Sequence, residues 1–309
     1  MPKVFIVVLN WQTYLHTKET LDSLREISYS NFEILLVDNG SCDGSAQALE
    51  EFLKNEWSLA GPKAHYIRNS ANLGFAGGNN VGIKFSLENG ADYILLLNSD
   101  VKVDKYFLEP LIQVGQQHPS VGILGPRIYF YDKPEKLWFA GGVLNRTKTK
   151  GTHLGLHEPM TEEQKSGRPY EVDYVTGCAL LVKREVVEKI GLMPEDYFLF
   201  YEDADWSLRA KKAGYRIVVV PQSKIWHKES RSAVKGSYNY LYYMTRGGLM
   251  MGLRYASKYG EAIIYLISFW ILAKQYIKLI INYRRDWARP VIRGILDFYR
   301  GKTGKVKTP

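Results

Sequence analysis

Cysteine is scarce in this sequence. Among its 309 residues there are only Cys42 and Cys178, and neither belongs to a Cys-X-X-Cys pair. A framework of disulfides or a structural zinc site built on thiolates is therefore not expected. The two isolated cysteines fit a protein of a reducing compartment, which we predict to be the cytoplasm.

Long hydrophobic runs are also missing. The amino terminus, MPKVFIVVLNW, has an apolar segment too short for the core of a signal peptide, and no small-residue cleavage site follows it. We interpret this segment as the first core strand. Near the carboxyl terminus, residues 262–273 form an apolar run if Ser268 is tolerated. Spanning a bilayer takes about 20 residues, and Lys274 and Lys278 interrupt any extension of this run.

Negative charge is scarce in the last third of the chain. Residues 1–206 hold 20 Lys and Arg against 28 Asp and Glu, whereas residues 207–309 hold 21 against 4. The net charge of +9 thus hides two unequal parts, which we expect to meet different partners. A basic segment is typical of proteins that bind nucleic acid or an anionic membrane surface.

The first part of the chain contains apolar runs that alternate with helical segments. Each apolar run is continuous, which indicates a parallel sheet covered by helices on both faces. We predict its strands at residues 3–9, 32–37, 64–68 and 93–97, with a helix at about 79–87. Less regular strands are expected at residues 121–131, 138–143, 174–182 and 216–220, with a polar loop at 147–170.

The predicted fold class is therefore α/β, with a Rossmann-like, mostly parallel central sheet flanked by helices. We place this domain at residues 1–235. Residues 236–309 form a helical, amphipathic extension, because the sequence there becomes aromatic, apolar and basic.

Three of the predicted strands end in polar side chains. The first ends at Asn10, the second at Asp38, and the fourth in the sequence NSD, which contains Asn98 and Asp100. Because open parallel sheets bind ligands beyond the carboxyl ends of their strands, this edge is the predicted site. Asp100 suits a hard divalent cation whose shell is completed by phosphate oxygens. The alternative is that each polar residue only starts a turn.

A loop rich in glycine and asparagine, NSANLGFAGGNN at residues 69–80, precedes a predicted helix. Gly74, Gly77 and Gly78 would let the backbone approach a ligand closely. The loop matches neither the GxGxxG fingerprint nor a P-loop. The alternative is a flexible turn before a capped helix.

A cluster of acids, Glu202, Asp203 and Asp205, stands at the start of another predicted helix. Acids at this position are favourable through the helix macrodipole, which is a purely structural role. The aromatic residues before them, in the sequence YFLFY, are able to desolvate a carboxylate and raise its pKa, which suits a general base. His227 follows the last predicted strand and is a candidate to share a metal with Asp100, although a lone histidine is more often structural.

An ordered set of segments carries a resemblance to a known family: VVLNW, VDNGSCDGS, NLGFAGGNN, LLLNSD, VTGCALLVKREV, YEDADWSLRAKKAGYR and WHK. They resemble the family 2 inverting glycosyltransferases of the GT-A fold, and among these the bacterial rhamnosyltransferase-type enzymes that build surface polysaccharides. The resemblance covers about residues 3–230. It implies a nucleotide-sugar half at about residues 1–125 and an acceptor half at about 126–235.

The resemblance also implies a role for individual positions. Asp203 matches the catalytic base, with Glu202 beside it. Asp100 matches the last acid of the DXD motif, which holds Mg²⁺ or Mn²⁺ on the donor diphosphate, and His227 matches a histidine that completes the metal shell. Asn98 replaces the first acid of that motif, which removes one charge from the metal site. The positions matched to the nucleotide and the donor sugar are Asn10, Asp38, Asn72, Gly74, Gly77, Asn98, Gly177 and Cys178.

The implied activity is the transfer of a sugar, with rhamnose as a candidate, from a dTDP- or UDP-sugar to a hydroxyl of a glycan or lipid-linked glycan. A single displacement would invert the anomeric carbon. For the basic C-terminal region we expect an anionic membrane surface as partner, on the inner face of the cell membrane. The alternative is a helix pair that packs on the main domain or across a homodimer.

Three rival functions predict other features. A nucleotidyltransferase that makes sugar nucleotides needs a glycine-rich loop with a basic residue after the first strand, and LNWQTYLHTKE has none. A non-catalytic carbohydrate-binding or scaffolding protein is favoured if Asn98 marks a defunct metal site. Nucleic-acid binding is not expected, because the positive charges of the tail stand among Leu, Ile and Trp without a recognisable motif.

Overall fold

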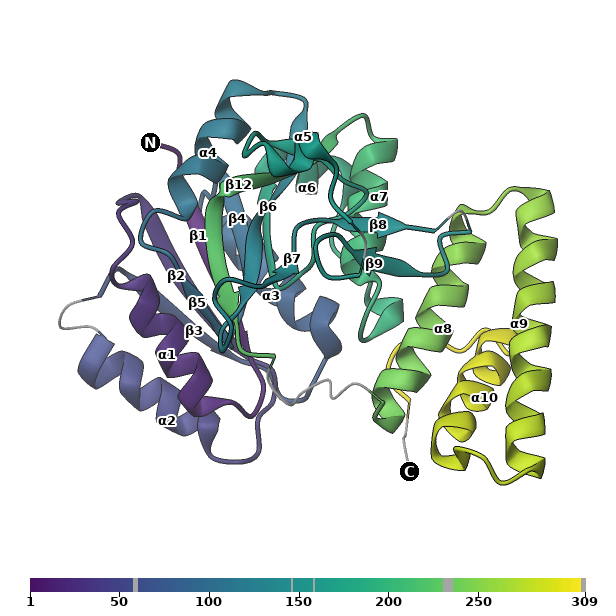
Figure 1. The fold of residues 1–309 in the computed structure, drawn as a ribbon. Helices are drawn as coiled ribbons and strands as arrows, with labels where there is room; N and C mark the ends of the chain where they lie inside the picture. The colour runs from purple at the N-terminus through teal and green to yellow at the C-terminus, as the bar shows by residue number, and fades with distance from the viewer. Residues whose placement is uncertain (58–60, 146, 158, 230–235, 307–309) are drawn as a thin grey trace.

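The computed structural model describes residues 1–57, 61–145, 147–157, 159–229 and 236–306. A central sheet carries helices on both faces, and three C-terminal helices stand beside it (Figure 1). This arrangement confirms the predicted α/β class with a helical C-terminal extension. The predicted boundary after residue 235 falls beside residues 230–235, which lie outside the described residues.

The first four long strands form the parallel half of the sheet, in the order β3-β2-β1-β4. Their bounds agree closely with the four predicted strands: β1 Val4–Asn10, β2 Phe32–Asp38, β3 Ala64–Arg68 and β4 Tyr93–Asn98. Parallel strands end at the same edge, so the polar residues that follow them are brought together there.

Helices cover both faces of this sheet, which explains why its strands are continuous apolar runs. Val4 and Ile6 of β1 pack in the core beneath α1, α2 and α4, whereas Phe5 and Val7 face the core beneath α3, α6 and α7. The helix bounds are α1 Tyr14–Leu24, α2 Ser45–Phe52, α3 Gly74–Glu88, α4 Leu108–Gln117, α6 Arg184–Ile190 and α7 Glu202–Lys212.

Beyond β4 the sheet becomes mixed. β11 (Ala179–Lys183) lies antiparallel between β4 and β6 (Val121–Phe130), and β12 (Arg216–His227) runs parallel to β6. The strand predicted at 174–182 begins only at Ala179, because Ala179 N closes a turn onto Thr176 O (3.2 Å).

The middle of the chain contains more short elements than predicted. The strand predicted at 138–143 is divided into two, and the loop predicted at 147–170 contains a strand and a helical turn. These elements are β5 Val101–Val103, β7 Leu137–Phe139, β8 Gly142–Leu144, β9 Gly151–His153, α5 Glu162–Lys165, β10 Tyr170–Glu171 and the helical turn η2 Glu195–Tyr197. A further helical turn, η1 Leu53–Trp57, directly follows α2. The strand predicted at 216–220 continues to His227, which matters for the site.

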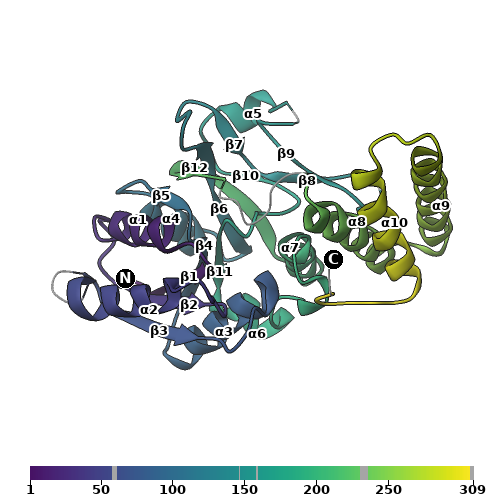
Figure 2. The same ribbon diagram turned by 90° about the horizontal axis from the view of Figure 1, so that it is seen from below.

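Three helices make up the C-terminal region: α8 (Tyr238–Tyr255), α9 (Lys258–Ile280) and α10 (Arg285–Tyr299). Ser237 and Ser257 cap the first two, because their hydroxyls accept hydrogen bonds from backbone N–H groups of the first turn. In Figure 2, α8 and α10 lie between α7 and α9, so α9 is the outermost layer of this region.

The apolar run predicted at residues 262–273 belongs to a longer apolar helix than expected. By length and composition alone, α9 is able to cross a membrane, and only 17% of its most apolar window is buried. The side of α9 that is buried packs in a small core formed with α8 and α10, which contains Leu249, Ile264, Ile295 and Phe298.

Candidate active site

β1 and β2 end side by side at Asn10 and Asp38, which are partners in the parallel register. Asn10 Nδ2 donates a hydrogen bond to Asp38 Oδ2 (2.7 Å), and Ser41 N donates to Asp38 Oδ1 (2.9 Å). Both predicted residues are fully buried. The structure brings them together, and in it they shape the loop after β2. Their contact with a nucleoside stays a prediction.

Asn39, which sequence reasoning did not single out, holds the glycine-rich loop in place. Its Nδ2 donates to Asn72 Oδ1 (3.2 Å) and to Gly74 O (3.0 Å), and its Oδ1 accepts from Leu73 N (3.1 Å). The sequence did indicate a residue near the site at this position, because Asn39 directly follows Asp38 in VDNGS. A buried amide with both ends bonded fixes the loop that the resemblance places along the nucleotide.

α3 begins at Gly74, earlier than the predicted start near residue 79, so Gly74 and Gly77 lie in its first turns. Gly74 has a φ of +80°, and a Cβ there would lie 2.5 Å from Phe198 O. Asn72 Oδ1 accepts a hydrogen bond from Gly74 N (2.8 Å). At Gly74 the close approach is to the loop before α7, so glycine is required at this position. The approach of this loop to a ligand stays a prediction.

Asp100 and His227 lie together because β5 pairs antiparallel with the end of β12, which sets Val101 opposite His227. His227 Nε2 is 3.2 Å from Asp100 Oδ1, and both side chains are almost completely buried. The ring of Trp138 packs edge-on against His227, with ring centroids 4.5 Å apart. The Nδ1 atom of His227 is buried without a hydrogen-bond partner among the described residues.

The geometry of this pair fits a divalent cation. Two ligands at right angles around a cation of the Mg²⁺ type, each at about 2.1 Å, are separated by about 3 Å, which agrees with the 3.2 Å observed. No group of three or more His, Cys, Asp or Glu residues able to hold a metal occurs among the described residues. A cation here would therefore have Asp100 and His227 as its ligands of these four types among the described residues, and oxygens from a diphosphate and water would complete its shell, as is common for Mg²⁺.

Asn98 and Ser99, which precede Asp100, are used by the fold. Asn98 N donates to Cys178 O (2.9 Å) and so joins the end of β4 to the segment before β11. The Ser99 hydroxyl is 3.1 Å from that of Thr13, which follows β1. Asn98 is the last residue of β4, two positions before Asp100, and a direct role for its side chain in donor binding stays a prediction.

Asp203 lies in the first turn of α7 and faces Gly177. Its Oδ2 accepts a hydrogen bond from Gly177 N (2.8 Å), and its Oδ1 accepts one from Ala204 N (2.7 Å). Burial raises the pKa of the Asp203 carboxyl, although these backbone hydrogen bonds oppose the shift. Part of the side chain remains exposed. A partly accessible carboxylate with a raised pKa suits a general base.

Glu202 differs from its neighbour. It is 4% exposed, and its Oε2 atom has no hydrogen-bond partner among the described residues. Burial raises the pKa of Glu202 well above its usual value, and the charge of Asp203 raises it further. Burial and the negative charge of Asp203 therefore both favour the protonated form of Glu202.

Cys178 lies between the segment at Asp203 and the end of β4, because the adjacent Gly177 bonds to Asp203 and Cys178 O accepts from Asn98 N. Burial raises the pKa of its thiol well above the usual value, and the charges of Asp100 and Asp203 raise it further. Both acids therefore lie within electrostatic range of this one thiol. The adjacent Gly177 contacts the Asp203 side chain, since a Cβ at Gly177 would lie 3.7 Å from Asp203 Cβ. Residues that are far apart in the sequence thus converge on the turn before β11.

Asp205, the third acid of the cluster, is structural. It is fully buried and pairs with Arg254 of α8 and with Arg209 Nε (2.9 Å). It also accepts hydrogen bonds from the hydroxyls of Tyr197 (2.7 Å) and Tyr255 (2.8 Å). The sequence alone did not separate this acid from its neighbours, because its partners come from the C-terminal region.

The residues just before Glu202 adopt strained backbone conformations. Phe198, Phe200 and Tyr201 have φ values of 67°, 67° and 73°, a region that favours glycine. α8 supports this segment, because the buried Arg246 donates to Tyr197 O (3.0 Å). Such strain persists only where surrounding contacts enforce it, and it is frequent at functional sites.

The glycines of α8 allow this close support. A Cβ at Gly248 would lie 2.3 Å from Thr149 O, in the turn between β8 and β9, and the Tyr201 hydroxyl donates to that same oxygen (3.0 Å). The C-terminal region is therefore part of the framework that positions Asp203.

Residues 4–191 match the model of glycosyl transferase family 2. The chain belongs to this family. The matched span contains the strand ends, the glycine-rich loop and the turn at Gly177, while Asp203 and His227 lie beyond it.

Curated relatives of this glycosyltransferase carry related names. It is 24% identical to the low-salt glycan biosynthesis hexosyltransferase Agl10 of Haloferax volcanii, over 97% of this chain and 92% of the relative. It is 25% identical to the dTDP-rhamnosyl transferase RfbF of Shigella flexneri, over 75% and 71% of the two chains. It is 26% identical to the N-acetylglucosaminyl-diphospho-decaprenol L-rhamnosyltransferase of Mycobacterium tuberculosis, over 76% and 79%.

Solved structures share the fold of this glycosyltransferase. The mannosyltransferase PcManGT of Pyrobaculum calidifontis, in complex with GDP-Man and Mn²⁺, superposes with a TM-score of 0.57 at 14% identity, over 97% of this chain and 88% of that one. GalNAc-T7 with UDP, GalNAc and Mn²⁺ gives a TM-score of 0.69 at 16% identity, over 89% of this chain but 51% of the longer one. The fold is thus of the GT-A type, as predicted from the sequence.

Proposed function

We propose that this glycosyltransferase moves a sugar, with rhamnose as the first candidate, from a dTDP- or UDP-sugar to a hydroxyl of a glycan or lipid-linked glycan in cell-surface polysaccharide synthesis. The observation that carries the proposal is that two distant segments hydrogen-bond to the turn at Gly177 and Cys178: Asp203, and the end of β4 that leads to Asp100. The names of the relatives support the sugar and the nucleotide, since one is a dTDP-rhamnosyl transferase and another an L-rhamnosyltransferase.

In the proposed reaction, Asp203 accepts the proton of the acceptor hydroxyl, whose oxygen attacks the anomeric carbon from the face opposite the nucleoside diphosphate. Removal of that proton as the new bond forms typically accelerates such a step by about 10²- to 10⁴-fold. One displacement exchanges the bond to diphosphate for the bond to the acceptor and inverts the anomeric centre. Burial and the charge of Asp203 favour the neutral form of Glu202, so in this proposal Asp203 is the carboxylate that accepts the proton.

Asp100 and His227 would hold Mg²⁺ or Mn²⁺ on the donor. When bound, a divalent cation supplies positive charge that stabilises the departing diphosphate. Because Asn98 stands where a second acid is usual, the protein contributes one carboxylate, and we expect the affinity for the free cation to depend strongly on the presence of the nucleotide. The fixed loop at Asn39 and Asn72 would orient the nucleotide sugar over Gly177.

The remaining partners follow from the same proposal. The N-terminal 235 residues would form the catalytic domain, and the basic C-terminal helices would attach it to the inner face of the cell membrane, where a lipid-linked acceptor is accessible. A homodimer is a further arrangement that these helices allow.

The experiment is a panel assay. The pure protein is incubated with Mg²⁺ or Mn²⁺, a set of dTDP-, UDP- and GDP-sugars, and glycan or lipid-linked acceptors, and the anomeric configuration of any product is read by NMR. We expect transfer with inversion from a dTDP- or UDP-sugar. Donor binding with neither transfer nor hydrolysis would instead favour a non-catalytic sugar-nucleotide scaffold.

A further inference from the structure

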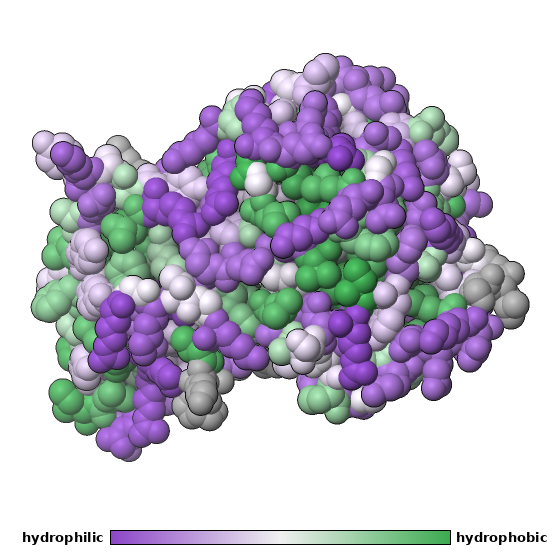
Figure 3. Space-filling view, turned by 180° about the vertical axis from the view of Figure 1, so that it is seen from behind, coloured by the Kyte–Doolittle hydropathy of each residue, from purple (hydrophilic) through white to green (hydrophobic). Residues whose placement is uncertain are grey.

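The outward half of α9 is an exposed apolar surface. Its exposed side chains include Ile263 (48%), Leu266 (57%), Phe269 (60%), Trp270 (67%), Ile277 (56%) and Ile280 (80%). On the opposite side of the same helix, Ile264, Ser268 and Gln275 are buried against the other C-terminal helices. Figure 3 shows apolar residues gathered over the C-terminal helices, at the left of that view. A soluble monomer rarely exposes a continuous apolar face of this extent, so we infer that something covers it.

The charges around this face indicate what covers it. Residues 236–309 hold 13 Lys and Arg against 3 Asp and Glu. Lys274 and Lys278 flank the apolar face on α9, and Arg284 and Arg285 follow at the start of α10. Aromatic and aliphatic side chains bordered by cations are typical of helices that lie in the headgroup region of an anionic bilayer.

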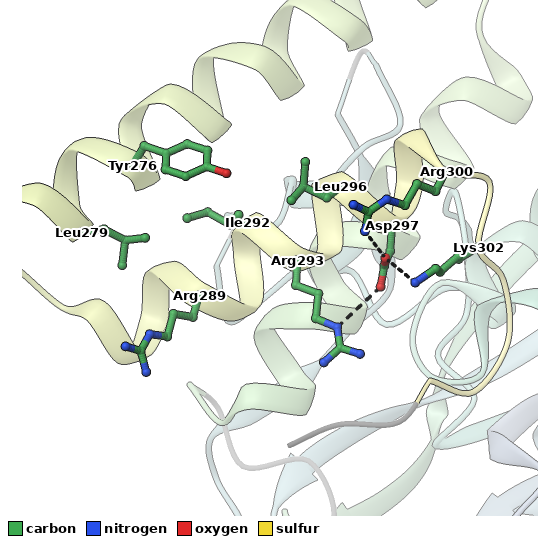
Figure 4. Close-up of a pocket in the computed structure, with 9 residues that line it drawn as sticks. All are labelled: Tyr276, Leu279, Arg289, Ile292, Arg293, Leu296, Asp297, Arg300 and Lys302. Carbon is green, nitrogen blue, oxygen red and sulfur yellow. Dashed lines mark hydrogen bonds and ion pairs between the residues drawn. The ribbon is translucent and has the colours of Figure 1, made fainter.

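A groove between α9 and α10 adds a second and more specific feature (Figure 4). It has a volume of about 370 Å³, and Tyr276, Leu279, Ile292 and Leu296 supply its apolar lining. Arg289, Arg293, Arg300 and Lys302 bring four cations to it. The groove lies within the C-terminal helices, away from the acids of the active site.

The carboxylate of Asp297 balances only some of these cations. Asp297 is 1% exposed, and its oxygens are 2.9 Å from Lys302 Nζ, 3.5 Å from Arg300 Nη1 and 3.6 Å from Arg293 Nε. The side chain of Arg289 makes no hydrogen bond or ion pair with any described residue, and Figure 4 shows it near the start of α10, at the end of the group away from Asp297. An anion is therefore the ligand that the groove favours, and apolar atoms next to it suit an acyl chain.

We propose that α9 lies in the plane of the membrane, with its outward half at the boundary between headgroups and acyl chains, and that the groove between α9 and α10 binds the phosphate of an anionic phospholipid. This inference deepens the proposed attachment to the membrane and rests on it. The inference specifies the outward half of α9 as the membrane-facing surface, a phosphate as the headgroup chemistry, and Arg289 as the residue that contacts this phosphate.

Two other occupants of the face agree less well with the structure. If α9 crossed the bilayer, it would separate from α8 and α10, and the polar side chains of Ser268 and Gln275, which are buried here, would be exposed to hydrocarbon. The Ser268 hydroxyl would also lose its contact with the Tyr299 hydroxyl, which is 2.7 Å away. A second copy of this chain would bring the same cations to the contact, and like charges facing one another weaken association.

The test uses the full chain, because removing the C-terminal helices would also remove the support of the segment before Glu202. Vesicles of phosphatidylcholine, with and without phosphatidylglycerol, are sedimented with the wild type and with Arg289→Glu and Trp270→Ser. Two variants serve as matched controls. Lys84→Glu makes the same charge change on α3, and Tyr106→Ser removes an aromatic side chain of similar exposure (60%) near α4.

We expect the wild type and both controls to bind vesicles that contain phosphatidylglycerol, and to bind neutral vesicles far less. Arg289→Glu and Trp270→Ser should each lose about tenfold or more in partition coefficient. The binding should weaken as salt is added. Melting temperatures equal to that of the wild type would show that the variants are folded.

Three outcomes overturn the proposal: no binding of the wild type to anionic vesicles, unchanged binding of Arg289→Glu, or a lipid-free dimer that Trp270→Ser dissociates while vesicle binding is unaffected. Nucleotide-sugar hydrolysis is measured on the same samples. If vesicles bind but no sugar is released or transferred, the proposed catalytic function fails while the membrane site stands.

Discussion

His227 Nε2 lies 3.2 Å from Asp100 Oδ1, although one residue follows β4 and the other ends β12. The three-residue strand β5 creates this relationship, because its antiparallel pairing sets Val101 opposite His227. A short edge pairing therefore decides whether two distant residues are able to hold one cation.

His227→Ala is expected to raise the Mn²⁺ concentration needed for half-maximal activity at least about tenfold, since one of the two protein ligands is lost. The measurement is a Mn²⁺ titration of nucleotide-sugar hydrolysis or transfer. His118→Ala, an exposed histidine just after α4, is the control. Superimposable titrations of the two variants would remove His227 from the metal site.

Asp203→Asn is expected to lose about 10²- to 10⁴-fold in kcat with donor binding retained, because the proton acceptor is removed. Glu202→Gln should stay close to the wild type, because the neutral amide resembles the protonated form of Glu202, which burial and the charge of Asp203 favour. Steady-state kinetics and nucleotide-induced thermal stabilisation separate the two effects. Comparable losses of kcat in both variants would mean that the roles of the two acids are misassigned.

The pH profile gives a separate test of the base. Activity needs ionised Asp203, so it should fall as the pH drops through the pKa of this carboxyl. Burial raises that pKa, so the acid limb should lie at higher pH than for an ordinary aspartate. In Glu202→Gln the limb should stay in place. An acid limb at the pH of a solvated aspartate would contradict the environment described for Asp203.

Asp205→Asn should lower the free energy of unfolding by about 3 kcal/mol, because Arg254 and Arg209 would lose a buried partner. The free energy is obtained from urea unfolding. Glu188→Gln, which breaks the exposed ion pair with Arg184, should cost about 0.5 kcal/mol or less. Equal costs for the two substitutions would show that Asp205 does not anchor α7 to α8.

Glu33 should contribute to stability against acid. Burial opposes its ionisation, but hydrogen bonds from Lys3, His65 and Lys63 lower its pKa to about 2. Its folded pKa is lower than its unfolded pKa, so the contribution is present above the unfolded value and is lost as pH falls towards about 2. Glu33→Gln should therefore lower the unfolding free energy by about 1 to 2 kcal/mol at pH 7, after allowance for solvent screening. Urea unfolding at pH 7 and near pH 3 should show the difference shrinking, and a constant difference would contradict this account.

The sequence was sufficient to predict the parallel half of the sheet, because buried strands are continuous apolar runs that are easy to recognise. It was less informative about the second half, where strands such as β5 and β7 have only three residues. It also placed the start of α3 too late, because glycines usually indicate a loop, whereas Gly74 and Gly77 are needed here for close packing against neighbours.

The candidate site divides in the same way. Asp100, Asp203 and His227 were predicted from motifs, and their roles stay predictions. The structure brings Asp100 to His227, and it places Cys178 where the charges of Asp100 and Asp203 both act on its thiol. The structural role of Asp205 was not predictable, since its partners Arg254 and Tyr255 come from α8. Contacts between distant segments leave no local pattern in the sequence, so contacts of this kind were not predicted.

The positive φ angles of the residues just before Glu202 have a consequence for protein engineering. Arg246 and the closely fitted Gly248 hold that segment, so the C-terminal helices and the start of α7, where Asp203 lies, form one structural unit. A chimera that exchanges these helices with those of another transferase, in order to redirect the enzyme to a new membrane or acceptor, should lose turnover unless the aromatic segment is transplanted together with them.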